Sequence, residues 1–66
     1  MKITINGEVK ELNHEVDLYS LMEILSLPSQ RIAVELNREV VRRKDWSSTT
    51  IKDSDQLEIV HLVGGG

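Results

Sequence analysis

The sequence of 66 residues contains no cysteine. This absence excludes disulfide bonds, thiolate zinc sites, iron–sulfur clusters and a persulfide carried on a side chain. If the chain takes part in redox or sulfur chemistry, the reacting group must therefore be some other atom.

Aromatic residues are almost absent as well, with one Trp, one Tyr and no Phe. The interior must be aliphatic, because the chain has eight Leu, six Ile and seven Val. A chain of this length buries only about 60% of the surface that its unfolded form exposes. There is room for one small core and little for a deep catalytic cleft, so we expect a single domain that is not an enzyme.

An excess of positive charge and long apolar runs are also lacking. The 8 basic residues are outnumbered by 11 acidic ones, so the chain lacks the basic surface that nucleic-acid binding requires. No apolar run approaches the roughly 20 residues of a transmembrane helix, and the N-terminal residues lack the apolar segment of a signal peptide. We expect a cytoplasmic protein without nucleic-acid or membrane partners.

The N-terminal residues predict a β-hairpin. Lys2–Ile5 alternates polar and apolar side chains, which is the period of a strand with one buried face. Asn6 and Gly7 follow, and this pair favours a type I′ turn, in which both central residues need positive φ. Residues 8–12 then supply the returning strand.

A helix is predicted over residues 18–26, with Asp17 as its N-cap. Its apolar residues recur at spacings of three and four, which places them on one face. Val16 before the cap and Leu21 inside the helix are spaced to form a hydrophobic staple. Pro28 is expected to end the helix, because the residue before a proline is pushed out of the α region.

The second half of the chain predicts three further strands, at residues 31–36, 39–41 and 56–62, with turns at 37–38 and 52–55. Residues 42–50 have no clear period, so we expect a loop that includes one helical turn and is anchored by Trp46.

The predicted order of elements is strand, strand, helix, strand, strand, strand. This order does not suit a doubly wound sheet. It indicates an α+β fold of the β-grasp pattern, with a mixed sheet of about five strands packed on one main helix. We expect the β-grasp domain to comprise residues 1–63, and residues 64–66 to form a flexible C-terminal glycine tail.

The final residues, Gly64, Gly65 and Gly66, are the feature most informative about function. Glycine has no Cβ, so this tail can enter a slot too narrow for other residues. A terminal carboxylate is ionised at neutral pH and can attack the α-phosphate of ATP on a partner that binds both. Without a thiol, an activated sulfur group would have to sit on the Gly66 carboxyl, as an acyl-adenylate and then a thiocarboxylate. The alternative is a frayed end without function.

Other polar residues carry weaker signals. The sequence has no GxxxxGK[ST] or GxGxxG motif, so any nucleotide must be bound by another protein. His14 and His61 match no metal-ligand spacing, and we expect neither a metal site nor a catalytic residue. Asp53 and Asp55 are expected to be turn residues. The basic residues 42–44 are expected to be solvated, with docking on an acidic partner surface as the alternative.

The last strand has apolar residues on both faces. Leu57 and Ile59 share the face expected to meet the helix, which leaves Val60 and Leu62 on the opposite face. Together with Ala33 on the neighbouring strand they form an apolar patch beside the tail, and such patches mark partner sites. The alternative is a different strand register, or ordinary scattered apolar residues on the surface.

Three segments carry a resemblance to a known family: Ile5-Asn6-Gly7, the central IAVELN of residues 32–37, and the ending EIVHLVGGG of residues 58–66. With these segments and its length, the whole chain resembles the ThiS family. These are the small sulfur carrier proteins of thiamine biosynthesis, within the ubiquitin-like β-grasp superfamily. Only the glycine tail is diagnostic of mechanism, because many carriers share the strands and turns.

The resemblance implies that a ThiF-like adenylyltransferase consumes ATP to adenylate Gly66. It also implies conversion to a thiocarboxylate with sulfur from cysteine, supplied through a cysteine desulfurase, and delivery to a ThiG-like thiazole synthase. Gly64, Gly65 and Gly66 would thread the active sites of the partners. The partner-binding surface would comprise Val60, Leu62, Val63 and Ala33. The carrier itself would bind no cofactor and would be a monomer when free.

Two departures and three alternatives accompany this resemblance. The turn before the last strand has Ser54 where such carriers often have glycine, and the chain ends in three glycines where many relatives have two. A sulfur carrier of molybdopterin synthesis uses the same terminal chemistry but is usually longer. Modifiers of the ubiquitin type carry arginines before the diglycine, where this chain has Leu62 and Val63. A β-grasp module that only binds proteins would work without Gly66.

Overall fold

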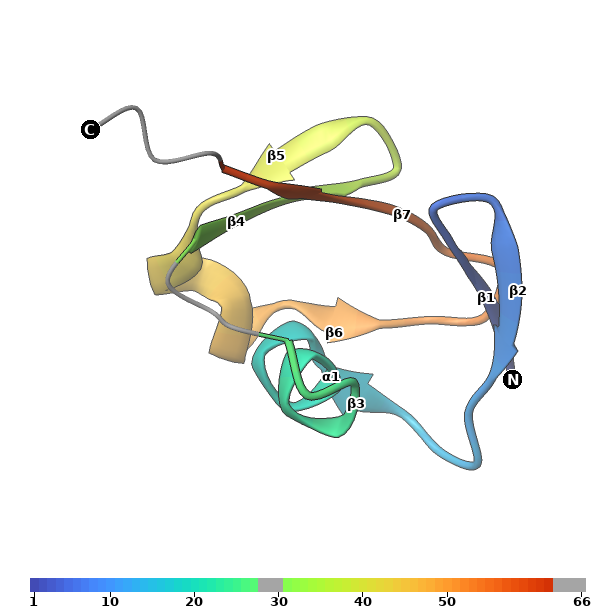
Figure 1. Cartoon of the computed structure of the whole chain (residues 1–66). Coiled ribbons are helices and arrows are strands. Elements are labelled where there is room, and N and C mark those ends of the chain that lie inside the picture. Colours follow the sequence, from blue (N-terminus) through green and yellow to red (C-terminus); the bar gives the residue numbers. More distant parts are fainter. Residues whose placement is uncertain (28–30, 63–66) are drawn as a thin grey trace.

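The computed structural model describes residues 1–27 and 31–62, which form a main sheet with a helix packed on one face (Figure 1). The five strands of the main sheet lie in the order β2-β1-β7-β4-β5, and a small second sheet pairs β3 with β6. The predicted α+β architecture with a mixed sheet is confirmed. The elements along the chain are β1 (Lys2–Ile5), β2 (Glu8–Glu11), β3 (Val16–Asp17), α1 (Leu18–Ile24), β4 (Ile32–Leu36), β5 (Glu39–Val41), the 3-10 helix η2 (Arg43–Ser48), β6 (Thr50–Ile51) and β7 (Gln56–His61).

The last strand, β7, occupies the centre of the main sheet. It pairs in parallel with β1 and antiparallel with β4, whereas β1–β2 and β4–β5 are antiparallel hairpins. The two ends of the chain are therefore joined by the sheet, with β1 and β7 as neighbours. No helix among the described residues is long and apolar enough to cross a membrane.

The turns follow the predicted chemistry. Asn6 and Gly7 have φ of 50° and 83°, as the type I′ turn of the first hairpin requires. Asn37 and Arg38 also have positive φ, so the second hairpin makes a similar turn without glycine. Ser54 takes φ of 72° in the turn before β7, a conformation that favours glycine.

Helix α1 begins as predicted but ends earlier. Asp17 is the N-cap, and its carboxylate accepts hydrogen bonds from the backbone N–H of Ser20 at 2.9 Å and from its hydroxyl at 2.7 Å. The helix ends at Ile24, two residues before the predicted end, and Pro28 lies outside the described residues. Ser26 takes φ of 57°, and the N–H of Leu27 bonds the carbonyl of Met22 across the end, as in a Schellman motif.

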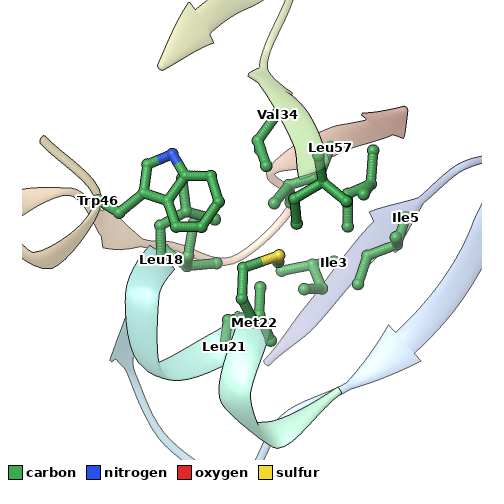
Figure 2. Close-up of a cluster of buried hydrophobic side chains, with 11 residues drawn as sticks. Ile3, Ile5, Leu18, Leu21, Met22, Val34, Trp46 and Leu57 are labelled. Carbon is green, nitrogen blue, oxygen red and sulfur yellow. The ribbon is translucent and has the colours of Figure 1, made fainter. Parts of the chain in front are cut away.

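The core lies between α1 and the inner face of the main sheet (Figure 2). Trp46 reaches it from η2 and donates its indole N–H to the carbonyl of Val41 at 3.0 Å, so its predicted anchoring role is confirmed. Within the described part of the chain the buried residues are all apolar: Ile3, Ile5, Leu18, Leu21, Met22, Ile32, Val34, Trp46, Ile51, Leu57 and Ile59.

The segment around Trp46 is more ordered than the predicted loop. Residues 43–48 form a 3-10 helix, and the two-residue strand β6 pairs with β3 through Val16↔Ile51 and Asp17↔Thr50. The sequence prediction missed β3 and β6, because strands of two residues are too short to show alternation. Their pairing ties the start of α1 to the segment that carries Trp46.

The cap of α1 makes part of the stability depend on pH. The hydrogen bonds from Ser20 hold the pKa of Asp17 below its ordinary value of 3.8. Since the folded pKa is the lower one, this stabilisation is present above the unfolded pKa and is lost as pH falls through the folded pKa. We expect Asp17→Asn, which keeps a capping oxygen, to unfold like wild type near neutral pH and to lose less stability as the pH falls below about 4. Urea unfolding across that range would measure this, and parallel profiles for the two proteins would contradict it.

Candidate functional site

The candidate site is the C-terminal end of β7 and the sheet surface around it. Leu57 and Ile59 point inward and are 1% and 7% exposed, so the strand that leads to the glycine tail is anchored in the core. The backbone N–H of Leu62 donates to the carbonyl of Arg31 at 2.7 Å, which extends the bonding to β4 one residue beyond β7. Val63, Gly64, Gly65 and Gly66 lie outside the described residues.

Asn6 holds the other side of β7. The backbone N–H of Asn6 donates to the carbonyl of Leu57 at 2.9 Å, where the backbone pairing of β1 with β7 ends. The side chain of Asn6 then continues the ladder. Its Oδ1 accepts from the N–H of Ile59 at 2.7 Å, and its Nδ2 donates to the carbonyl of Ile59 at 3.2 Å. The amide therefore makes the two hydrogen bonds that the backbone of one more residue of β1 would otherwise make to β7. The sequence predicted Asn6 only as a turn residue, so this role was missed.

The predicted apolar patch is present on the outer face, meaning the surface of the main sheet opposite α1. Val60 pairs directly with Ala33, so the register expected from the sequence is confirmed. Val60 and Leu62 are 52% and 54% exposed, in contrast to the inward-facing residues of the same strand. These three residues lie beside the point where the tail begins.

Charged residues form a second feature of the outer face. Glu35 pairs with Glu58 across β4 and β7, and Val40 of β5 lies on the other side of Glu35. Arg42 follows β5 in an extended conformation, with φ of −68° and ψ of 146°. The sequence shows these residues, but only the strand register reveals that the two carboxylates are neighbours.

The remaining polar candidates are not brought together. His14 lies in the segment between β2 and β3, and His61 is the last residue of β7. Figure 1 shows this segment and the end of β7 on opposite sides of the view. Asp53 and Asp55 accept backbone hydrogen bonds, from Lys2 and Lys52 at 2.7 Å each, so their prediction as turn residues is confirmed. Within residues 1–27 and 31–62, no group of three or more His, Cys, Asp or Glu side chains could hold a metal ion.

Taken together, these residues can present a chain end but offer no built catalytic centre among the described residues. The buried side of β7 fixes where the tail starts, and the exposed side provides an apolar and charged surface at the same place. Such an arrangement suits a protein whose terminus is acted on by a partner that grips the adjacent face.

Comparisons with known proteins agree with this arrangement. The model of the family described as "ThiS family" matches residues 3–66. The chain is 30% identical over 67 residues to the sulfur carrier protein ThiS of Bacillus subtilis, covering 97% of this chain and 98% of that protein. It is also 36% identical to a thiazole synthase of Paramagnetospirillum magneticum, over 66 residues that cover all of this chain. The chain spans only a fifth of that thiazole synthase's length.

A solved structure gives the same result for the fold. The crystal structure of a thiamine biosynthesis protein (ThiS) from Geobacter metallireducens superposes with a TM-score of 0.88. The two chains are 32% identical and each is covered completely. The β-grasp architecture predicted from the order of elements is therefore confirmed.

The role of Asn6 can be tested by Asn6→Gly, which accepts the positive φ without strain and removes only the amide. We expect a loss of about 1–3 kcal/mol in the free energy of unfolding, because the N–H and carbonyl of Ile59 lose their partners. Asn13→Gly, at an exposed position in the β2–β3 segment, is the control and should cost less than about 1 kcal/mol. Equal losses of unfolding free energy for the two variants would show that the side-chain hydrogen bonds of Asn6 do not stabilise the fold.

The assignment of the two faces of β7 can be tested at adjacent positions. Ile59→Thr places a hydroxyl in the core and should cost about 2–4 kcal/mol of unfolding free energy. Val60→Thr, on the outer face, should change it by less than about 0.5 kcal/mol. Thermal or urea unfolding measures both, and a large loss for Val60→Thr would place Val60 in the core.

Proposed function

The chain belongs to the ThiS family, and we propose that it is a sulfur carrier protein of thiamine biosynthesis. The observation that carries this proposal is the extent of the match. The family model spans residues 3–66, and the chain aligns over 98% of the Bacillus subtilis sulfur carrier and the whole of the Escherichia coli one. The likeness thus includes the C-terminal residues that the chemistry requires.

The reacting group is the carboxyl of Gly66. Its oxygen attacks the α-phosphate of ATP, pyrophosphate leaves, and a glycyl-adenylate forms. A cysteine persulfide on the sulfur donor then attacks the carbonyl carbon through its outer sulfur and displaces AMP, which gives an acyl persulfide. A thiol, such as that of free cysteine, attacks the donor's sulfur, and cleavage of the S–S bond leaves the thiocarboxylate on the carrier and a disulfide on the donor. ATP binding and catalysis belong to a ThiF-like adenylyltransferase, and the sulfur comes from cysteine through a desulfurase.

The carrier contributes position and access. Gly64, Gly65 and Gly66 have no side chains, so they fit a narrow slot in the adenylating enzyme and again in a ThiG-like thiazole synthase. Relatives named thiazole synthase support this second partner, because they contain a segment similar to the whole of this chain. Val60, Leu62, Val63 and Ala33 form the surface that both partners grip. The carrier works in the cytoplasm and is a monomer when free.

The experiment is intact-protein mass spectrometry after incubation with a ThiF-type adenylyltransferase, ATP, a cysteine desulfurase and cysteine. We expect a mass increase equal to the difference between one sulfur and one oxygen atom, located on the C-terminal peptide. A chain that lacks Gly66 is the negative control. No change of mass under these conditions, with full biological activity of the shortened chain, would overturn the proposal.

The narrow-slot argument makes a separate prediction. Gly65→Trp should fold like wild type, because it lies beyond the last strand, but should not be adenylated because its side chain blocks the slot. Circular dichroism checks the fold, and pyrophosphate release measures adenylation. Gly65→Ala is the graded control and should be adenylated more slowly than wild type; normal rates for Gly65→Trp would refute the argument.

A further inference from the structure

Two cross-strand rows on the outer face have opposite charge. The row nearer the tail contains Val60 of β7 and Ala33 of β4, which are paired. Arg42 belongs to the same row, since Val41 pairs with Val34 and the extended backbone of Arg42 continues β5 by one residue. Side chains alternate along a strand, so Arg42 points to the same side as Val40, away from the core.

The next row, one step further from the tail, carries two carboxylates. Glu35 is paired with Glu58, and Val40, which is 68% exposed, flanks Glu35 on β5. Residues on one side of a strand are separated by about 7 Å. The outer face therefore has a cation beside the apolar patch at the tail end, and two anions about 7 Å behind it.

The two carboxylates are not neutralised within the described part of the chain. No ion pair or hydrogen bond of either side chain is found there, and Arg42, diagonal to Glu35, makes no ion pair with a described residue. Like charges directly opposite each other on adjacent strands destabilise a sheet. A pair that costs stability on an exposed face, next to a patch that suits docking, points to a role in recognition.

We infer that this face binds its partner through a two-part charge match. The partner presents a carboxylate toward Arg42, close to the opening that receives the tail, and a Lys or Arg side chain between Glu35 and Glu58. An apolar side chain of the partner contacts Ala33 and Val60 between these charges. The inference rests on the proposed function, because it takes the enzyme that activates the tail as the partner.

The charge order gives the contact a direction. An apolar patch alone does not fix how the carrier is rotated on the partner's surface. In most of these rotations the tail would point away from the slot that has to receive it. With a cation at the tail end and anions behind it, only one rotation pairs both charges correctly. The match therefore sets the orientation in which Gly66 reaches the active site.

The test uses two charge reversals, Glu58→Lys and Arg42→Glu, in the full chain. The probe is a purified ThiF-type adenylyltransferase with ATP, and pyrophosphate release is followed as the carrier concentration is varied. We expect each variant to raise the KM for the carrier by about tenfold with kcat nearly unchanged, and this difference to shrink at high salt. Glu11→Lys is the matched control and should stay within about twofold of wild type, because it lies on the same face, opposite Lys2 at the far end of the sheet.

A stability measurement separates recognition from folding. Glu58→Lys puts opposite charges across β4 and β7, so its melting temperature should rise by about 1–5 °C while its KM worsens. A variant that is more stable and yet binds less well cannot owe its defect to unfolding. A fall in melting temperature with normal KM would contradict both the like-charge argument and the inference.

The outcomes distinguish this inference from the proposed function. If wild type is adenylated and both reversals behave like Glu11→Lys, the charge match is wrong and the carrier function stands. If wild type is not adenylated at all, the proposed function fails and the inference falls with it. If sedimentation shows a dimer that Glu58→Lys or Arg42→Glu dissociates, without a change in KM, the face binds a second copy and the inference is overturned.

Discussion

The placement of β7 between β1 and β4 is the constraint on which the rest of the structure depends. Leu57 and Ile59 fill the centre of the core from this strand, so the sheet cannot be completed until the end of the chain has folded back to its beginning. The same pairing determines where the tail leaves the sheet. The backbone hydrogen bonds of β7 therefore both stabilise the fold and set the position at which the chain leaves the sheet.

Side-chain amides and carboxylates complete this sheet where backbone partners run out. Asn6 provides the next step of the ladder to Ile59, and Asn37 accepts from the N–H of Gln56 at the start of β7. Asp53 accepts from the N–H of Lys2, which joins the turn before β7 to the start of β1. A small domain without disulfides can therefore add side-chain hydrogen bonds from residues distant in the sequence where the backbone ladder of its central strand ends, while its interior stays entirely apolar among the described residues.

The division between the two faces of the sheet separates stability from recognition. Leu57 and Ile59 are nearly inaccessible while Val60 of the same strand is about half exposed, so the core and the outer face take alternate side chains of β7. This arrangement suits a protein that more than one partner has to grip in the same place. The like-charged pair of Glu35 and Glu58 is the exception, because it makes the outer face slightly costly to the fold.

Much of this protein was determined by the sequence itself. The hairpin at Asn6-Gly7, the cap at Asp17 and the inward face of the last strand follow from positive φ, side-chain capping and a period of two, which are local properties. The lack of cysteine and the triglycine ending likewise predict that the terminal carboxyl is the reacting group. The end of α1 could not be predicted so well, because a serine in the left-handed conformation closed the helix before the proline.

Only the tertiary structure decided that the amide of Asn6 replaces a strand, that β3 pairs with β6, and that Glu35, Glu58 and Arg42 share one surface. Each of these depends on which distant residues lie opposite one another, and strand register arises from the packing of the whole sheet, not from any single segment.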